Sequence, residues 1–414
     1  MKHLLNFAKA ILCMVFMILA SCTEDEILVS EKESVTIEEN LITAKAVSCN
    51  TNIDFEIKAM DVSFLPQLEA KNLIFKNSNN QAQSLLPLIK GSGVNTIRLR
   101  LWMNNTGIYG YNEVKKLSDR AKTLGFKTWI SIHYRDTWAD LNNQNAPTLW
   151  GWNKLNLPQL EDAVKNYTKN VVSDLKPDYV QIGNETNLGM LLPIGNFKSN
   201  LGNFKSLVKA GIKGAKEGYP CAKTIIHYAG IGDAATNYFK VLWDLDYDIM
   251  AVSYYPFYNE DLNDLKSTLI ALNTINKFRV ENSNKSNLRL LIAETAYPFT
   301  LKNDDKVKNI IRNYKLEPLE VGEVRATLLT RKQYPANTTG QSNYIKDLRN
   351  TLAVVPNTIG FGYWGGEYVA FSGINPLNNI SGSNYDNLAL FYRFDKKKYP
   401  KAYKVLPALN EFKK

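Results

Sequence analysis

Short, nearly continuous apolar segments recur along the chain from about residue 50 onward, and polar or amphipathic stretches separate them. Segments of this kind are typical of strands that are buried on both faces of a parallel sheet. We expect eight strands, at residues 55–62, 94–102, 126–134, 178–184, 223–228, 247–255, 288–294 and 358–364.

Amphipathic stretches between these segments predict helices, for example at 111–124, which Gly125 closes, and at 159–175. Eight strand–helix alternations predict an α/β fold, a (β/α)8 TIM barrel that forms a single domain with enlarged loops. A doubly wound sheet is the alternative, but no glycine-rich phosphate loop follows the first strand. The stretch 302–331 is long for a loop, and we interpret it as an insertion beside the seventh strand, with a helix or hairpin of its own as an option.

The first 22 residues have the pattern of an export signal. Lys2 and Lys9 form a basic region before an apolar run over 10–20, and this run is too short to span a bilayer comfortably. The run ends in Leu-Ala-Ser before Cys22, which resembles a bacterial lipobox, where the peptide is cut before a lipidated cysteine. We therefore expect 1–21 to be a signal peptide and Cys22 to anchor the protein to a membrane. An ordinary secretory signal is the alternative.

Residues 22–48 are polar and acidic, and we interpret them as a flexible tether that precedes a catalytic domain at 49–414. The acidic residues directly after Cys22 resemble the surface-export signal of bacterial lipoproteins. This resemblance implies an outer-membrane, cell-surface location.

Composition narrows the function classes. The 45% hydrophobic content excludes global disorder, and only three histidines argue against a multi-histidine metal enzyme. The chain has 50 Lys+Arg against 40 Asp+Glu, but the positive charge is scattered, so we expect no nucleic acid partner. Cys49 and Cys221 are able to form one disulfide, which the sequence alone leaves open. We expect a monomer.

Polar residues follow the expected strands at their carboxyl ends, where the chemistry of barrel enzymes is located. Glu185 and Glu294 each end an apolar strand, where an unpaired carboxylate would be costly. Two carboxylates facing one cavity are what glycosidic bond cleavage requires. A purely structural role, in which each glutamate pairs with an arginine such as Arg98, is the alternative. The other expected substrate-binding residues are Asp61, Arg98, Trp102, His133, Asp136, Trp138, Asn184, His227, Tyr255 and Trp364.

Several of these residues have a definite expected role. The Asn184 amide is placed to bind the sugar 2-hydroxyl, and His133, Tyr255 and Arg98 are placed to orient the carboxylates. Tryptophan rings offer flat faces to sugars, although core packing is an equal alternative for each of them. The candidates are Trp102, Trp138, Trp150, Trp152 and Trp364.

These motifs resemble glycoside hydrolase family 53, the endo-β-1,4-galactanases of a large retaining barrel clan. The shared segments are D-V-S at 61–63, N-x-I-R-L-R-L-W at 95–102, H-Y-x-D-T-W-A-D at 133–140, Q-I-G-N-E-T-x-x-G-M-L at 181–191, S-Y-Y-P at 253–256 and E-T-A-Y-P at 294–298. The match runs from about 57 to 395, which is most of the chain.

The resemblance implies that Glu185 is the general acid/base and Glu294 the nucleophile of a retaining hydrolase. It implies internal cleavage of β-1,4-galactan, the neutral side chain of pectin, with no cofactor in the chemistry. Some bacterial relatives hold a structural calcium in a late loop, and the oxygen-rich stretch 375–387 is the candidate for such a site here, although Asp386 is its only acid.

Departures from the family pattern concern residues around the catalytic pair. Arg135 and Leu141 replace a serine and a proline, Leu192 and Tyr385 replace tryptophans, and Gly365-Gly366 follow Trp364 where Glu-Pro is usual. These changes put the outer subsites in doubt. Two other hypotheses remain open: a retaining barrel endoglycanase acting on mannan, xylan or glucan, and a non-catalytic glycan-binding surface lipoprotein.

Overall fold

The structure is a computed structural model, and it describes residues 49, 56–259, 261–283, 285–305, 307–311, 334–370, 383–393, 395, 397–398 and 400–414. The expected signal peptide, Cys22 and the tether lie outside these residues, as do 312–331 of the expected insertion and 375–382 of the late loop. By its internal contacts, Val47–Lys414 forms one compact unit.

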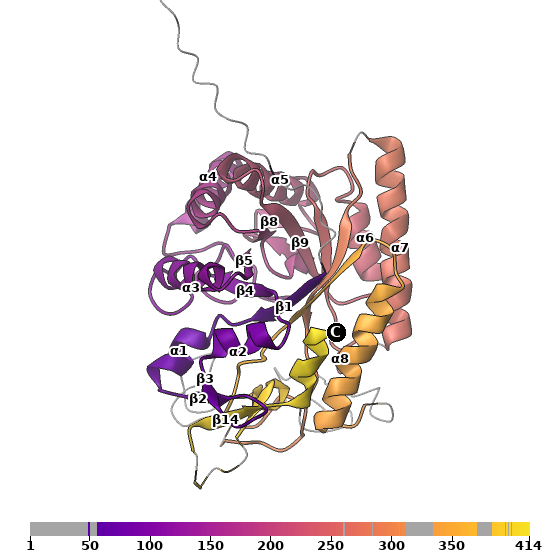
Figure 1. The fold of residues 1–414 in the computed structure, drawn as a ribbon. Helices are drawn as coiled ribbons and strands as arrows, with labels where there is room; N and C mark the ends of the chain where they lie inside the picture. Colours follow the sequence, from indigo (N-terminus) through magenta and orange to yellow (C-terminus); the bar gives the residue numbers. More distant parts are fainter. Residues whose placement is uncertain are drawn as a thin grey trace, which may run out of the picture. The chain divides into compact units, whose positions relative to one another are not determined.

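Eight parallel strands close into a barrel in the order β1-β12-β11-β10-β9-β6-β5-β4 (Figure 1). The eight expected strands are confirmed, and so is the barrel. Their bounds are β1 Ile57–Asp61, β4 Thr96–Leu101, β5 Lys127–Ile132, β6 Tyr179–Ile182, β9 Lys223–Ala229, β10 Ile249–Ser253, β11 Arg289–Thr295 and β12 Thr358–Tyr363.

The pairing of β1 with β12 closes the barrel, with Ile57 opposite Gly360. Gly360 has φ +126°, and a Cβ atom there would lie 1.9 Å from the Ile57 carbonyl oxygen. Only glycine therefore permits the two backbones to approach at this point.

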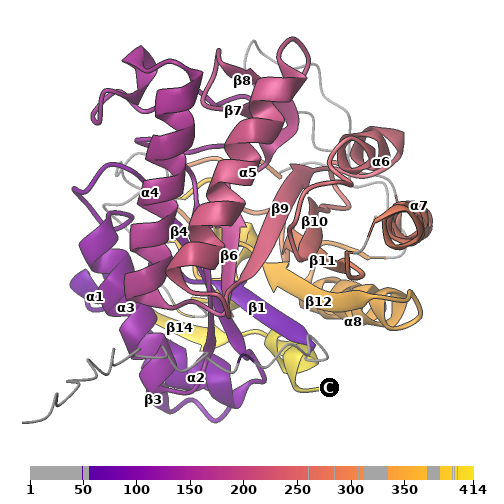
Figure 2. The same ribbon diagram turned by 90° about the horizontal axis from the view of Figure 1, so that it is seen from above.

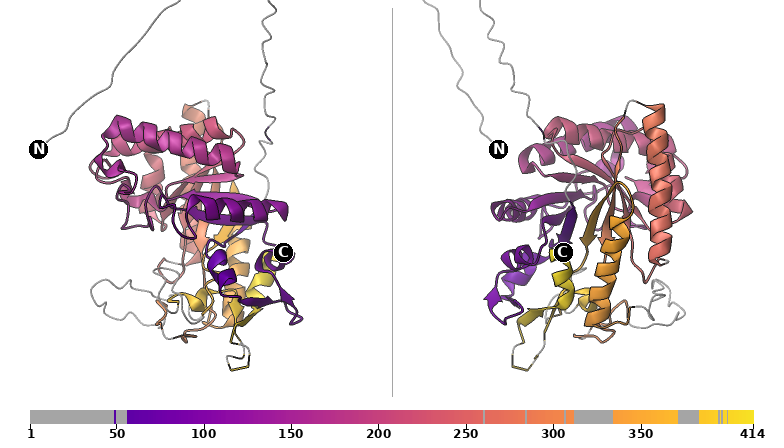
Figure 3. Two further views of the ribbon diagram at one scale, coloured as in Figure 1. Left: turned by 90° about the vertical axis from the view of Figure 1, so that its left-hand side faces the viewer. Right: turned by 45° about the vertical axis from the view of Figure 1, so that its right-hand side comes forward.

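Helices surround the ring of strands, as the view from above shows (Figure 2). Next to each other on the outside of the barrel lie α7 and α8 (Figure 3). The expected helices at 111–124 and 159–175 are confirmed as α3 and α4. The helices are α1 Leu65–Ala70, α2 Leu85–Gly91, α3 Tyr111–Thr123, α4 Leu157–Leu175, α5 Leu201–Gly218, α6 Asp233–Lys240, α7 Leu262–Asn282 and α8 Thr338–Ala353.

Local signals in the sequence explain where α4 begins. Asn156 accepts a hydrogen bond from the Gln159 backbone N–H, and the Gln159 side chain in turn accepts from the Asn156 backbone N–H. This reciprocal capping box satisfies two backbone donors that a helix start leaves unpaired.

The barrel interior has an apolar layer below a polar layer. Because successive side chains of a strand point to opposite faces of the sheet, residues two positions apart on one strand both point into the barrel interior or both point out of it. Ala59 and Trp129 belong to a buried apolar cluster, whereas Asp61 and Ser131, two residues further along, begin the polar layer. The apolar cluster consists of Ile57, Ala59, Trp129, Tyr179, Ile225, Ile249, Ala251, Leu291, Ala293 and Ile359.

Smaller elements decorate the barrel. A four-stranded sheet has the order β13-β14-β2-β3, with β13 Phe391–Tyr392, β14 Ala402–Val405, β2 Ile74–Lys76 and β3 Ala82–Gln83, and β7 Gly189–Met190 pairs with β8 Gly195–Asn196. In the four-stranded sheet, the pairing of β14 with β2 brings segments from near the two ends of the described barrel domain together (Figure 1).

Short 3-10 helices complete the described elements: η1 Trp152–Lys154, η2 Thr186–Leu188, η3 Asp386–Leu388 and η4 Pro407–Lys413. Cys49 and Cys221 form a disulfide, which answers the question that the sequence left open. Of the helices that the structure describes, none has the length and apolar character needed to cross a membrane.

Candidate active site

A cavity of about 900 Å³ opens at the carboxyl ends of the barrel strands. Typical small-molecule sites range from about 300 to 1,000 Å³, so a short run of sugar units fits within it. Seven residues expected at the site line this cavity: Arg98, His133, Trp138, Asn184, Glu185, Tyr255 and Trp364, together with the second carboxylate, Glu294.

The turn that follows β6 places Glu185 in this cavity. Gly183 has φ +77°, and Glu185 itself has φ +47°, in the left-handed region that residues with a Cβ rarely adopt. Such backbone strain is commonly stored at functional sites, where the surrounding structure holds it in place. Directly after this turn, Thr186 begins η2, and its hydroxyl bonds to Tyr238 at 2.6 Å.

The Glu185 carboxylate is the end of a hydrogen-bond chain. Ser253 Oγ donates to its Oε1 at 2.6 Å, and His227 Nε2 lies 2.8 Å from the same Ser253 oxygen. Burial raises the pKa of Glu185 to about 8, the negative charge of Glu294 adds to the increase, and the Ser253 hydrogen bond opposes it. The carboxyl group is therefore protonated at neutral pH, as a general acid must be.

The Glu294 carboxylate is buried, with 7% of its surface exposed, and it has two fixed partners. Arg98 Nη2 lies 2.7 Å from Oε1, and the Tyr255 hydroxyl donates to Oε2 at 3.0 Å. Arg98 and Glu294 form a buried ion pair at the cavity floor. The arrangement can thus supply a carboxylate nucleophile next to a protonated acid.

Buried charges under the cavity hold Arg98 in place. Asp61 accepts from Arg98 Nη1 at 2.9 Å and from Arg100 Nη2 at 3.0 Å. Burial by itself would raise the pKa of Asp61, but the charges of Arg100 and Arg98 hold it below its usual value. Asp61 is therefore an anion that orients two arginines, one of which orients Glu294.

The Asn184 side chain is fixed on both of its polar atoms. Its Oδ1 accepts from Arg98 Nη2 at 2.9 Å and from Gln181 Nε2 at 2.8 Å, and its Nδ2 donates to the Ala139 carbonyl at 2.9 Å. The second N–H of the amide has no acceptor among the described residues, and Asn184 lines the cavity. This geometry suits the expected contact with a sugar hydroxyl.

Both histidines of the barrel are buried and neutral. Burial lowers the pKa of His133 well below its usual value, and the charges of Arg100 and Arg98 lower it further. Burial likewise lowers the pKa of His227, and Arg98 adds to the effect. The His133 Nδ1 atom accepts a hydrogen bond from the Ala139 backbone at 3.0 Å, so its proton is on Nε2.

Aromatic rings form the walls of the cavity. The Arg100 guanidinium lies over the Trp138 ring at 4.2 Å, which holds that indole against the charged layer. The Trp364 ring lies edge-on to Trp138, with 6.4 Å between centroids, and also packs edge-on against Tyr385 at 4.9 Å. Such faces are platforms on which sugar rings can stack.

Four of the expected substrate-binding residues do not line the cavity. Asp61 and His227 are fully buried beneath it, and Trp102 packs behind Trp138 with 5.6 Å between ring centroids. Asp136 points into its own loop, where its Oδ2 accepts from the backbone N–H groups of residues 148 and 149. These four side chains lie beneath or beside the cavity.

Comparison with known proteins decides the family. Residues 57–412 match the model of glycosyl hydrolase family 53. The chain belongs to glycosyl hydrolase family 53. It is therefore a glycoside hydrolase.

Individual relatives agree with this membership. An uncharacterised protein encoded in the bgaB 5′ region of Niallia circulans is 32% identical, over 81% of this chain and 89% of the relative. A probable arabinogalactan endo-β-1,4-galactanase A of Aspergillus terreus is 30% identical, over 82% of this chain and 91% of the relative. The solved catalytic domain of an Ignisphaera aggregans family 53 protein has a TM-score of 0.73 and 29% identity, and the match covers 88% of this chain and 96% of that one.

Departures from the family 53 pattern are found in the cavity wall. Arg135, Leu141 and Tyr385 all line the cavity, whereas Leu192 does not. Glu367, which follows the two glycines after Trp364, is fully buried, and burial together with the Asp61 charge raises its pKa well above the usual value.

Ser253 is one residue of this family 53 site that was not predicted from the sequence. It is the first residue of the S-Y-Y-P motif and the last residue of β10, opposite Glu294 of β11. Its place at a strand end was the signal that could have found it. Gln181 is a second such residue, because its amide joins Asn184 and His227 at 2.8 and 3.1 Å.

The expected calcium concerns the loop around Asp386. This carboxylate accepts from the Asn309 amide at 2.7 Å and from the Asp304 backbone N–H at 3.1 Å, and burial raises its pKa to about 7. Over the residues that the structure describes, no group of three or more His, Cys, Asp or Glu side chains is placed to hold a metal ion. The calcium ion stays a prediction, since 375–382 of the expected loop lie outside the described residues.

Proposed function

We propose that this family 53 hydrolase is an endo-acting β-1,4-galactanase that cleaves the galactan side chains of pectin with retention of anomeric configuration. The observation that carries the proposal is the pairing of two unlike glutamates in one cavity. Glu185 has its pKa raised to about 8, while Glu294 is bound to Arg98 at 2.7 Å. Family relatives named arabinogalactan endo-β-1,4-galactanase support the choice of substrate.

In the first step the Glu294 carboxylate attacks the anomeric carbon while Glu185 gives its proton to the glycosidic oxygen. The bond between these two atoms breaks, and the shortened chain leaves with a new hydroxyl group. The sugar that remains is joined to Glu294 as an ester. Arg98 and Tyr255 fix the two Glu294 oxygens, so that one lone pair is aimed at the anomeric carbon.

In the second step a water molecule attacks the same carbon and gives its proton to Glu185, which releases Glu294. Two inversions at one carbon give net retention. The change of role follows from electrostatics, because the charge of Glu294 contributes to the raised pKa of Glu185. Formation of the ester removes that charge, so the pKa of Glu185 falls and the group becomes a base. The two carboxylates supply acid, base and nucleophile, so the proposed reaction needs no cofactor.

Asn184 is proposed to contact the sugar in the subsite where the ester forms. It lines the cavity with one free amide N–H, and its orientation is fixed through Arg98 and Ala139. A hydrogen bond to the 2-hydroxyl strengthens as the transition state develops positive charge on the ring.

A product time course on linear β-1,4-galactan tests substrate, endo action and stereochemistry together. We expect reducing sugar to appear with intermediate-length products first, and the β-anomer to be the first detected by proton NMR. Glu294→Gln is the inactive control. Release from mannan, xylan or cellulose but not from galactan would move the assignment to another retaining endoglycanase. Binding of galactan without any shortening would leave only a glycan-capturing role.

The cellular location is a separate proposal, since residues 1–48 lie outside the described structure. We propose that Cys22 is lipidated and that the protein is held at the outer-membrane surface. The disulfide between Cys49 and Cys221 supports export, because such bonds persist in oxidising compartments. Cys22→Ala is expected to move the protein from the membrane fraction to the soluble fraction. Protease treatment of intact cells distinguishes the cell surface from the periplasmic face.

The protein is proposed to act as a monomer, because one chain supplies both catalytic glutamates and every partner described for them. Light scattering after size exclusion measures this directly.

A further inference from the structure

A second cavity of about 470 Å³ lies on the outside of the barrel, between α3, α4 and the loop that follows β5. The two helices are neighbours around the barrel (Figures 1 and 2). None of its lining residues also lines the active-site cavity. Six of its lining residues carry an aromatic ring or a side-chain amide suited to a ligand: Asn112, Trp150, Trp152, Asn166, Tyr167 and Asn170.

Aromatic rings form one part of this outer cavity and are held rigidly. The Trp150 ring stands edge-on to Tyr167 at 5.4 Å and 85°, and the Trp152 ring does the same at 6.0 Å and 88°. The Trp150 indole N–H donates to the Met103 carbonyl at 2.7 Å, which fixes the ring, yet 44% of this side chain is exposed. A fixed and exposed indole face offers a stacking surface at a low cost in conformational entropy.

Side-chain amides form the other part. Asn166 and Asn170 are one helical turn apart on α4, and Asn112 is in the first turn of α3. Within the described residues, none of these three side-chain amides has a hydrogen-bond partner. Each offers a donor and an acceptor side by side, which suits neighbouring hydroxyl groups on a sugar ring.

The lining of the outer cavity contains no charged side chain among the described residues. A phosphate, a nucleic acid or a charged peptide would find no counter-charge there. The chemistry that matches apolar faces and uncharged amides is that of a neutral carbohydrate.

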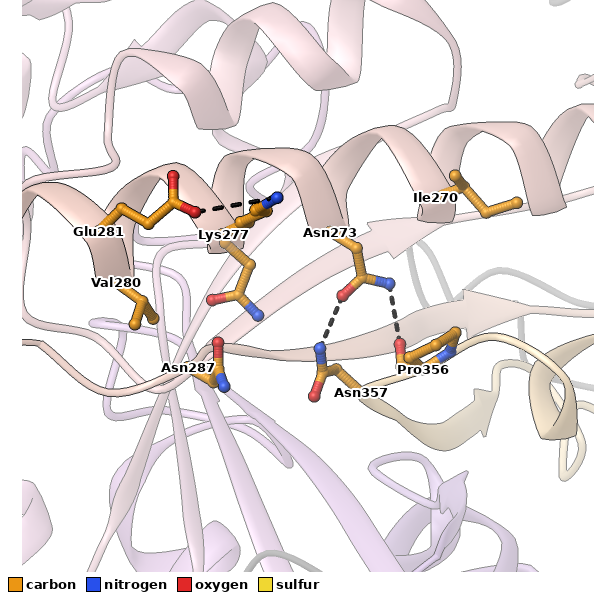
Figure 4. Close-up of a pocket in the computed structure, with 9 residues that line it drawn as sticks. Ile270, Asn273, Lys277, Val280, Glu281, Asn287, Pro356 and Asn357 are labelled. Carbon is orange, nitrogen blue, oxygen red and sulfur yellow. Dashed lines mark hydrogen bonds and ion pairs between the residues drawn. The ribbon is translucent and has the colours of Figure 1, made fainter.

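Another asparagine-rich hollow in the same molecule shows the contrast. The cavity beside α7 is lined by Asn273 and Asn357, but these amides bond to each other at 2.8 Å, and Asn273 also donates to the Pro356 carbonyl at 2.9 Å (Figure 4). That hollow has no aromatic lining residue. Its asparagines join α7 to the start of β12, whereas the outer cavity leaves its amides free.

We propose that the outer cavity is a second binding site for a neutral polysaccharide, which holds a chain on the enzyme away from the catalytic glutamates. The choice of β-1,4-galactan as that chain rests on the proposed function. The site itself rests on Trp150 and the free amides.

The test measures how strongly neutral glycans retard the protein in native gels. Glu294→Gln is the parent, so that the polymer is not cut. The pocket variant adds Asn166→Ala and Asn170→Ala, which are exposed helix positions where alanine is well tolerated. A second pocket variant carries Trp150→Ala alone in the Glu294→Gln parent. Asn263→Ala on α7 is the matched control, because it removes an exposed amide outside both cavities.

We expect both pocket variants to bind galactan at least about threefold more weakly than the parent and the control, since each variant removes a stacking surface or two hydrogen-bonding amides. With Glu294 intact, the Asn166→Ala/Asn170→Ala enzyme should cleave a short galacto-oligosaccharide within twofold of the wild-type rate. Equal retardation of parent and pocket variants by every neutral glycan, or no retardation of the parent at all, would overturn the proposal.

Failure of the proposed function would be seen separately. If the wild-type enzyme cleaves another neutral glycan and not galactan, the same gels are run with that glycan. A weaker retardation of the pocket variants would then support the outer site even though the galactanase assignment had failed.

Discussion

The Ser253 hydroxyl donates a hydrogen bond to Glu185 Oε1 at 2.6 Å, and its oxygen is free to accept one from His227 Nε2 at 2.8 Å. Because the serine proton is committed to the carboxylate, the His227 proton must be on Nε2. The low pKa of His227 keeps the ring neutral. The hydrogen bonds from His227 through Ser253 therefore place a dipole, and no positive charge, next to the Glu185 carboxylate. Ser253 is therefore a positioning residue that lowers the pKa of the general acid.

The first prediction concerns the pH profile of kcat/KM. In the wild-type enzyme the rate should fall as pH rises through about 8, because Glu185 loses its acidic proton there. Ser253→Ala removes the hydrogen bond that favours the ionised form, so the pKa of Glu185 should rise. A hydrogen bond to a charged group is worth about 1.5 kcal/mol or more, which corresponds to an upward shift of about one pH unit in the basic limb.

Ser253→Thr is the control, since it keeps the hydroxyl and should keep the basic limb within a few tenths of a unit. A merely structural role for Ser253 would lower the rate at all pH values alike. An unshifted basic limb in Ser253→Ala would therefore contradict the positioning role.

The second prediction assigns the two glutamates their separate roles by azide rescue. Glu185→Ala should lower kcat on galactan by about 10²–10⁴-fold, and Glu294→Ala by at least that much. Azide added to Glu185→Ala can attack the glycosyl ester from the vacated side and give a β-glycosyl azide. Azide added to Glu294→Ala can take the place of the missing nucleophile and give the α-azide.

Proton NMR of the two azide products reads the anomeric configuration directly, with an aryl glycoside as the substrate. Glu185→Gln and Glu294→Gln are the matched variants, because a bulkier side chain leaves less room for azide and should be rescued less. The same anomer from both alanine variants would refute the assignment.

Much of the fold follows from local patterns in the sequence. Each barrel strand is a short and largely apolar run, and Asp61, Glu185 and Glu294 lie at or just beyond the carboxyl ends of three of these strands. The sheet that joins β2 and β14 has no such signal, because its strands are two to four residues long and are paired by contacts distant in sequence.

The chemistry of the site could be predicted from the sequence, but which side chains face the cavity could not. The sequence places Asp136 and Trp138 at the same strand end, but only the loop conformation decides that Trp138 faces the cavity while Asp136 bonds to residues 148 and 149. Trp150 is comparable, because its ring faces a different cavity from the one that its position in the loop suggested.

The third prediction concerns the stability provided by Arg98. Its side chain is 2% exposed, and its guanidinium pairs with two carboxylates, those of Asp61 at 2.9 Å and Glu294 at 2.7 Å. Arg98→Met leaves Asp61 with Arg100 alone and Glu294 with no cationic partner among the described residues, which should lower the free energy of unfolding by about 3–5 kcal/mol. Urea unfolding followed by tryptophan fluorescence measures the change.

Arg120→Met is the matched control. Arg120 pairs with Glu69 at 2.7 Å, but both side chains are at least 40% exposed, so its loss should cost less than about 1 kcal/mol. Equal losses for Arg98→Met and Arg120→Met would show that the buried network contributes no more to stability than a surface pair.

The fourth prediction concerns the disulfide between Cys49 and Cys221, which are 172 residues apart in sequence. Cys221 lies between α5 and β9, so the bond ties the start of the described barrel domain to the connection before its fifth strand. Cross-linking two such distant positions restricts the unfolded chain, and its loss should lower the free energy of unfolding by about 2–4 kcal/mol. Cys49→Ser/Cys221→Ser, measured by urea unfolding, should show this decrease with little change in kcat/KM, because neither cysteine lines the active-site cavity.

Reductant should lower the stability of the wild-type protein to that of the double variant and should leave the variant unchanged. A wild-type protein whose unfolding is insensitive to reductant would contradict a stabilising disulfide.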